Sequence, residues 1–321
     1  MCERDTANWR GTERALVRMR SAARWQARGP AAARKIGGRA MTHTRQGLGG
    51  HDPFRSAGDM DPAAVRFWVR ALNHRAGAPD QRRLREHLVS RAQIGAGDRV
   101  LEMGCGTGAL LVDLARAVGS TGHVIGMEPQ AVFAHEARVR VCASGAHDWV
   151  EVIAGGVEDL TLLDDSVDAA VAQTVLIHLP SDTVTVAVAQ MRRVVRPGGW
   201  VVSADQDADA WIIDHPEREL TRRIVAFNSD QRYADGWTGR SLRRLFRSTG
   251  LHEVSVEPLV HMDTAPDSYL FGMAERTAHA AVDAGVLGSD QAERWVDVLR
   301  QRAEAGGFFS SINFYICRGR K

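Results

Sequence analysis

Residues 100–108 constrain the fold of this 321-residue chain more strongly than any other stretch. A short apolar run ends in Glu102, and glycines follow at positions 104, 106 and 108. Residues 109–115 then have the apolar pattern of a helix. A strand, a glycine turn and a helix in this order are typical of a nucleotide-type α/β site, because glycine lets a ligand contact bare main chain and a helix N-terminus attracts anions.

This stretch alone leaves the ligand open. Gly104, Gly106 and Ala109 also fit the looser dinucleotide fingerprint, which allows alanine at its last position. The rest of the chain therefore has to decide between a dinucleotide and another adenosine-containing ligand.

Strands and helices are predicted to alternate along the middle of the chain, which indicates a parallel, doubly wound sheet. The predicted strands lie at 100–102, 124–127, 150–153, 167–173 and 200–204, then at 251–256 and 309–317. The predicted helices outside this core lie at 61–72, 80–92, 241–249, 266–283 and 289–305. The connection 206–240 is longer than usual, which predicts inserted helices that form a lid.

Composition favours a globular chain with an unusual N-terminal extension. Apolar residues make up 44% and charged residues 25% of the sequence, and no apolar run approaches the ~20 residues of a membrane span. Residues 1–40 carry ten Arg or Lys against three acids, which would suit a nucleic-acid-binding arm, a transit peptide or a disordered extension. We expect residues 1–58 to be a disordered extension and linker. The four cysteines have neither paired nor metal-type spacing, so a cytoplasmic location is expected.

Polar residues follow the predicted strands at the edge where ligands bind in open α/β sheets. An acid at the end of the second strand can accept both hydrogen bonds of a ribose diol, and an acid beside the glycine turn can face a cation. A ligand with an adenosine, a positive centre and a small zwitterion would suit this set. The residues concerned are Glu102, Glu128, the segment 155–160, Gln173, His178 and Asp205.

At these positions the chain resembles the class I S-adenosylmethionine-dependent methyltransferases. The resemblance covers about residues 60–321, is closest in 98–205, and looks most like the small-molecule branch that includes quinone and natural-product enzymes. The matching segments are 100–108, Glu128, 158–160 with 164–168, 176–180, and 196–199, together with 314–321. The resemblance implies a mostly parallel, seven-stranded Rossmann-like sheet with an antiparallel last strand. It divides 59–321 into a cofactor half at 95–205 and lid or substrate segments at 60–92, 206–240 and 261–306.

The resemblance also implies the cofactor S-adenosylmethionine, its product S-adenosylhomocysteine, and a set of binding residues. The glycine turn would wrap the methionine part, Glu128 would hold the ribose hydroxyls, and Val157 would meet the adenine. The family often has Asp where this chain has Gly156, so Glu158 or Asp159 is expected to substitute. As alternatives, Glu158 and Asp159 form a solvated turn and Gln173 caps a helix. The predicted cofactor residues are Glu102, Gly104, Cys105, Gly106, Gly108, Glu128, Pro129, Gly156, Val157, Glu158 and Gln173.

Two residues are candidates for acid–base catalysis. His178 follows the fourth strand, where related natural-product O-methyltransferases carry a histidine implicated as base. Asp205 ends the fifth strand and would act as base or orient His178. The alternative for His178 is a histidine packed at a helix start. A divalent metal is not expected, because only one strong oxygen ligand is present where metal-dependent relatives carry several.

Aromatic residues in the variable segments are candidates for contacts with the acceptor, although large apolar groups in a lid are more often its core. The candidates are Trp211, Phe227, Tyr233, Trp237 and Tyr269. The slightly acidic folded part disfavours nucleic acid as substrate.

Three functions are consistent with the sequence. The leading one is methylation of oxygen or carbon on an aromatic, quinone or polyketide-like small molecule, without a membrane partner and with a homodimer left open. The second is a cyclase or isomerase that retains the cofactor without transferring its methyl group. The third, a dinucleotide-dependent oxidoreductase, is disfavoured by the family landmarks after residue 150.

Overall fold

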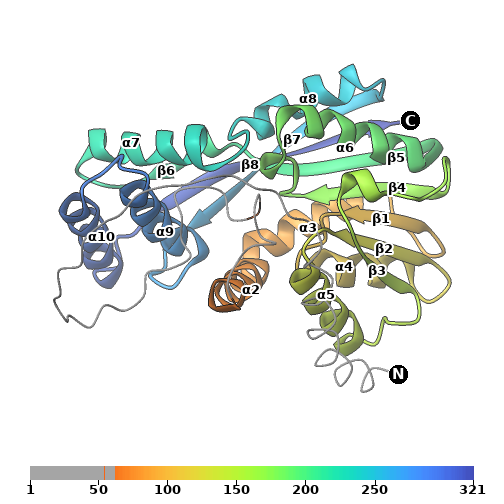
Figure 1. Cartoon of the computed structure of the whole chain (residues 1–321), viewed down its shortest axis with the longest axis horizontal. Helices are drawn as coiled ribbons and strands as arrows, with labels where there is room; N and C mark the ends of the chain where they lie inside the picture. Colours follow the sequence, from red (N-terminus) through yellow and green to blue (C-terminus); the bar gives the residue numbers. More distant parts are fainter. Residues whose placement is uncertain (1–53, 55–61) are drawn as a thin grey trace, which may run out of the picture. The chain divides into compact units, whose positions relative to one another are not determined.

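A mixed β-sheet organises the described part of the chain, which comprises Phe54 and residues 62–321 of the computed structural model (Figure 1). In these residues the strand order is β3-β2-β1-β4-β5-β8-β6, and β7 pairs with β8 outside this path. Strands β1 to β5 are mutually parallel, whereas β8 is antiparallel to both β5 and β7. The strands are β1 Arg99–Met103, β2 His123–Glu128, β3 Val150–Ala154, β4 Val167–Gln173, β5 Val195–Gln206, β6 Ile212–Ile213, β7 His252–Asp263 and β8 Ser310–Arg320.

Helices cover both faces of the sheet, as the sequence predicts. The helices are α2 Pro62–Gly77, α3 Pro79–Arg91, α4 Ala109–Val118, α5 Ala131–Ala143, α6 Ser181–Val194, α7 Arg218–Phe227, α8 Thr238–Ser248, α9 Tyr269–Asp283 and α10 Ser289–Glu304. Short 3-10 helices at Val157–Asp159, Leu176–His178 and Ala208–Ala210 and a π-helix at Asn228–Arg232 connect them. Figure 1 shows α3, α4 and α5 on one side of the parallel strands and α6 and α8 on the other.

Alternation of side chains along the strands divides the core into two layers. In β1, Val100 packs in the layer under α3 and α4, whereas Leu101 packs in the layer under α6 and α8. Both residues are completely buried. A strand that is apolar on both faces requires helices above and below it, so β1 has to lie in the interior of the sheet.

The predicted fold class is confirmed: the sheet is mostly parallel and doubly wound, and β8, its last strand in sequence, is antiparallel to β5. The main difference is the length of β7, which we expected to end at residue 256 and which continues to Asp263. Its extension pairs with β8 through partners such as Leu259 and Phe314. This pairing is non-local, so the pattern of the β7 segment alone does not reveal it.

Helices α7, α9 and α10 gather beside β6 and the extended ends of β7 and β8 (Figure 1). Their shared core includes Trp295, whose indole N–H donates to Thr221 Oγ1 at 3.0 Å. The connection 206–240 contributes β6 and α7 to this end of the molecule. Inserted helices are therefore confirmed. The predictions made for residues 1–53 and 55–61 lie outside the described residues.

Candidate functional site

The glycine turn after β1 has a backbone that side chains would obstruct. Gly104 has a φ of +69°, and a Cβ placed on it would lie 2.5 Å from Cγ2 of Val175. Gly108 has a φ of +78°, and its Cβ would lie 2.9 Å from the Cα of Ala137 on α5. Glycine is therefore required at position 104 because Val175, two residues after β4, lies close to it. It is required at position 108 because α5 packs closely against it.

Glu128, at the end of β2, is held in place by two main-chain donors. Gly106 N–H donates to its Oε2 at 2.9 Å, and Gln130 N–H donates to its Oε1 at 3.0 Å. The residue is 6% exposed, and burial raises its pKa above the ordinary glutamate value. A carboxylate has about four acceptor positions, so two remain for the hydroxyls of a ribose.

Glu102, in β1, is a buried acid with an unsatisfied oxygen. It is 3% exposed, and within the described part of the chain its Oε2 has no hydrogen-bond partner. Burial raises its pKa well above the ordinary value, although the charge of Arg85 opposes this. A buried acceptor without a donor costs about 1–3 kcal/mol, so the position suits a ligand that brings a donor such as an ammonium group.

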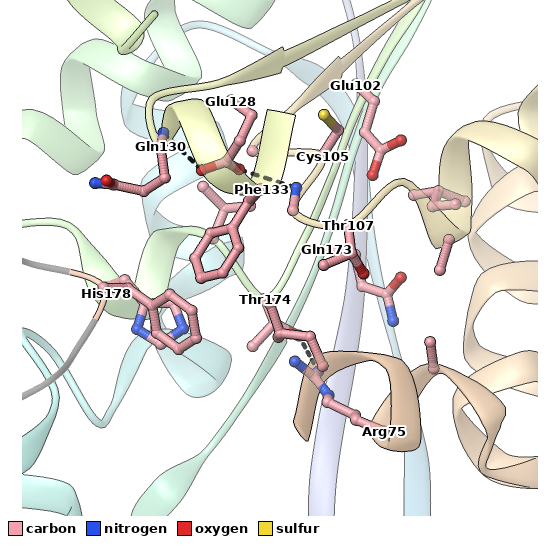
Figure 2. Close-up of a pocket in the computed structure, with 18 of the residues that line it drawn as sticks. Arg75, Glu102, Cys105, Thr107, Glu128, Gln130, Phe133, Gln173, Thr174 and His178 are labelled. Carbon is pink, nitrogen blue, oxygen red and sulfur yellow. Dashed lines mark hydrogen bonds between the residues drawn. The ribbon is translucent and has the colours of Figure 1, made fainter. Parts of the chain in front are cut away.

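The two carboxyl groups line one cavity, which we call the first cavity (Figure 2). Figure 2 shows Glu102 and Glu128 at one end of it and Arg75 with Thr174 at the other. Its empty volume, open mouth included, is about 1020 Å³, at the upper end of the usual range for small-molecule sites. The predicted residues that line it are Glu102, Gly104, Cys105, Gly106, Glu128, Pro129, Gln173 and His178.

A neighbouring hollow, the third cavity, continues from the first toward the end of β3. The two cavities share Gly104, Pro129, Val175 and His178. The predicted adenine-side residues Gly156, Val157 and Glu158 line the third cavity. Gly108 lines neither cavity, so the structure gives it a packing position.

His178 lies where three cavities meet. It ends the short helix after β4 and lines the first cavity, the third, and a second cavity under α2 and α9. Its ring centroid lies 4.8 Å from that of Phe54 and 5.5 Å from that of Tyr233. These contacts fix the position of the imidazole at the junction between the first and second cavities.

Asp205 lines none of the three cavities. It is completely buried and accepts hydrogen bonds from Ile177 N–H at 3.3 Å and Ser203 Oγ at 2.8 Å. Burial raises its pKa to about 6. We therefore withdraw Asp205 as a base in contact with substrate; its bond to Ile177 holds the segment that carries His178.

The five aromatic candidates for acceptor contacts separate into two groups. Tyr233 and Tyr269 line the second cavity. Trp211 and Phe227 are buried in the hydrophobic core and line none of the three cavities. Trp237 is 51% exposed, with the Arg240 guanidinium 4.7 Å from its ring centroid. We withdraw these last three as acceptor contacts, because packing and solvent exposure account for them.

Sequence reasoning missed several residues of the first cavity. Several of them come from α2, α3 and the segment before α2, which we treated as lid and linker. Arg75 lies one turn after Leu72 on α2, so the apolar face of that helix is a signal that could have identified it. Phe54 lies in the segment predicted to be disordered, yet its ring contacts Trp68, Phe133 and His178. The missed residues include Phe54, Leu72, Arg75, Gln81, Arg85, Thr107 and Phe133.

Fold and site together define an α/β protein that binds an adenosine ligand with a cationic amino-acid part. The glycine turn has the positive-φ backbone that lets a ligand contact bare main chain. Glu128 offers acceptors for a ribose, and the unsatisfied Glu102 suits the ammonium end. These residues fit S-adenosylmethionine. A dinucleotide is not needed to explain any of them.

Comparison with known proteins agrees with this class. Residues 100–199 match the family model described as a methyltransferase domain. A 37.1 kDa protein of transposon TN4556 from Streptomyces fradiae is 32% identical over 268 residues, covering 83% of this chain and 75% of that protein. The demethylmenaquinone methyltransferase of Desulfitobacterium hafniense is 31% identical over 121 residues, covering 38% of this chain and 47% of that enzyme.

Among solved structures, the YcgJ protein from Bacillus subtilis superposes with a TM-score of 0.52 at 18% identity, covering 74% of this chain and 97% of that one. This likeness concerns the fold alone. The matching family model and relatives show that the chain belongs to the class I S-adenosylmethionine-dependent methyltransferases, and S-adenosylmethionine is its cofactor.

Over the residues that the structure describes, no helix is long and apolar enough to cross a membrane. In the same residues, no group of three or more His, Cys, Asp or Glu side chains is arranged to hold a metal ion.

Proposed function

We propose that this enzyme transfers the methyl group of S-adenosylmethionine to an oxygen or carbon atom of a small organic acceptor bound in the second cavity. The observation that carries this proposal is the junction of the two cavities. The first and second cavities share Phe54, Leu72, Arg75, Thr174 and His178. The two cavities therefore adjoin at these five residues, and an acceptor in the second cavity would lie next to the cofactor in the first.

The binding roles follow from the contacts of the first cavity. Glu128 would accept the ribose hydroxyls while Gly106 and Gln130 hold its carboxylate in place. Glu102 would accept from the ammonium group, which satisfies its otherwise unpaired oxygen. Val157 and Glu158 would meet the adenine at the third cavity.

The bound cofactor supplies an electrophilic methyl group on a sulfonium, so the protein mainly has to align the acceptor and exclude water. Phe54, Phe133 and Leu179 line the first cavity with apolar surface that excludes water. His178 is positioned at the junction to accept the proton that a hydroxyl acceptor loses when its oxygen is methylated. The electron pair of the broken carbon–sulfur bond remains on sulfur, and the product of the cofactor is S-adenosylhomocysteine.

The acceptor class rests on relatives and on the lining of the second cavity. Proteins similar to this chain include methyltransferases named for demethylmenaquinone and for a phytyl naphthoquinone. The second cavity offers Trp68, Tyr233 and Tyr269, which suit a planar ring. We therefore propose an aromatic, quinone or polyketide-like acceptor.

The test combines cofactor binding with turnover. Calorimetry should show binding of S-adenosylmethionine, and mass spectrometry of reactions with phenols, hydroxynaphthoquinones and polyketide aromatics should show S-adenosylhomocysteine and a product heavier by one methylene. No cofactor binding would overturn the proposal. Product formation without S-adenosylhomocysteine would instead indicate a cyclase or isomerase that retains its cofactor.

Replacement of the junction histidine tests the role of base. With a hydroxyl acceptor, His178→Ala should lower kcat by about 10²–10⁴-fold and remove an ionisation from the pH profile, with cofactor affinity nearly unchanged. The control is His147→Ala, because His147 is a half-exposed histidine outside all three cavities. Full activity of His178→Ala would retire the residue as base.

A further inference from the structure

The second cavity contains three arginines from three separate elements. Arg75 comes from α2, Arg232 from the π-helix after α7, and Arg276 from α9. Arg232 is buried and Arg276 is half-buried. Three cations in one small cavity repel one another, so their presence together calls for a compensating negative charge.

No carboxylate forms an ion pair with these arginines within the described part of the chain, although the charges of Asp205 and Glu275 act on Arg75 and Arg276 at longer range. Nη2 of Arg75 donates to Thr174 Oγ1 at 2.5 Å, and Nη1 of Arg232 donates to Thr277 Oγ1 at 2.8 Å. Both partners are neutral hydroxyls. Among the residues that the structure describes, none of the three arginines forms a salt bridge, although many surface pairs of this kind are present.

The acid that lies next to Arg276 in the sequence is engaged elsewhere. Nη2 and Nε of Arg300 on α10 both donate to Oε1 of Glu275, at 2.7 and 3.0 Å. The Nε atoms of Arg75 and Arg276 are buried and have no hydrogen-bond partner in residues 54 and 62–321. The cavity therefore contains donors directed at no protein acceptor.

Aromatic rings compensate for part of this charge without neutralising it. The guanidinium carbons of Arg75 and Arg276 lie 5.5 and 6.0 Å from the centroid of the same Tyr269 ring, and that of Arg276 lies 5.9 Å from Trp68. Such contacts contribute about 0.5–2 kcal/mol each. Burial lowers the pKa of Arg276, yet a guanidinium stays protonated at neutral pH. Partly desolvated positive charge therefore remains.

We propose that the acceptor carries an oxyanion, a carboxylate or a phosphate ester, which Arg276 and Arg232 bind while the atom to be methylated faces His178. Both arginines line the second cavity and not the first, whereas His178 lines both. The planar guanidinium fork matches carboxylate and phosphate oxygens in a bidentate manner. This inference rests on the proposed function, because it assigns the acceptor's charge within the same site.

Binding to the full-length protein saturated with S-adenosylhomocysteine tests the inference without needing turnover. The probes are benzoate, phenyl phosphate and the neutral benzamide, each titrated by calorimetry. At least one of the two anions should bind about tenfold more tightly than benzamide, since charge-assisted bonds are roughly twice as strong as neutral ones. A preference for benzoate identifies a carboxylate, and a preference for phenyl phosphate identifies a phosphate ester.

Variants connect this preference to the arginine cluster. Arg276→Met should abolish the preference for the anion, and Arg276→Lys should retain most of it because the charge is kept. The matched control is Arg294→Met, because Arg294 is an exposed arginine on α10 outside the three cavities. Circular dichroism and affinity for S-adenosylhomocysteine should be unchanged in all three.

Two results would overturn the inference. If wild-type protein binds benzamide as tightly as both anions, the acceptor's charge is not recognised, while binding of S-adenosylhomocysteine leaves the methyltransferase proposal intact. If Arg276→Met keeps the full anion preference, the cluster is not its source. Absence of S-adenosylhomocysteine binding would remove the proposed function and this inference together.

Discussion

Asp205 gives the sharpest quantitative prediction because its charge is buried and few groups surround it. Its oxygens accept from Ile177 N–H and Ser203 Oγ, and the residue is completely buried. In Asp205→Asn the amide oxygen can accept from Ile177 while the NH₂ group donates to the serine oxygen. The substitution thus preserves both contacts and removes only the ionisable proton.

The size of the effect follows from the pKa of Asp205, which burial raises from 3.8 to about 6. The folded state binds this proton more tightly than the unfolded state, so the free energy of unfolding falls as pH rises from about 4 to about 6. A shift of about two pKa units corresponds to about 3 kcal/mol. This destabilisation is complete above pH 6 and absent below pH 4.

Asp205→Asn should therefore be more stable than wild type by up to about 3 kcal/mol at pH 8 and equally stable at pH 4. Urea unfolding of both proteins at intervals between pH 4 and 8 measures the difference, in which all other titrating groups cancel. Asp283→Asn, at an exposed aspartate, is the control and should show no such trend. A difference independent of pH, or a less stable Asp205→Asn at pH 8, would refute the assignment of a buried, destabilised carboxylate.

Two further predictions concern the glycine turn and the ribose acid. Gly108→Ala should lower the free energy of unfolding by about 2–4 kcal/mol, because its Cβ would lie 2.9 Å from the Cα of Ala137 at a positive φ, whereas Gly106→Ala meets open space and should lower it by about 1–2 kcal/mol. Equal urea midpoints for the two variants would contradict this steric argument. Glu128→Gln replaces one acceptor oxygen by a donor that opposes Gly106 or Gln130 N–H, so calorimetry should show cofactor affinity reduced by about 1–3 kcal/mol; unchanged affinity would remove Glu128 from the ribose site.

The parallel half of the fold could be predicted from the sequence because its signals are local. The apolar runs of β1, β2 and β4 and the helices between them are set by periodicity within each segment. The antiparallel end of the sheet was harder to predict from the sequence. Strand β6 has two residues, and β7 owes its last residues to register with β8, so both depend on a partner far along the chain.

The residues of the candidate site likewise divide into those that local sequence signals predict and those that only tertiary packing reveals. Glu102, Glu128 and His178 could be proposed because parallel strands bring their carboxyl ends to one edge of the sheet. Phe54 could not, because tertiary packing alone brings it to the cavity. The aromatic candidates illustrate a general limit: aromatic composition predicts burial but does not distinguish the hydrophobic core from a cavity wall.

The residues that line only one of the two cavities differ in the sign of their net charge on the two sides of His178. Glu102 and Glu128 line only the first cavity, and Arg232 and Arg276 line only the second. A cofactor with a cationic amino-acid part suits the acidic side, and an anionic acceptor suits the basic side. The sulfonium charge disappears when the methyl group leaves, so the attraction that draws an anionic acceptor toward the junction is present before transfer and lost after it. If the acceptor is anionic, as we propose, this arrangement favours its binding to the charged cofactor and its release as product.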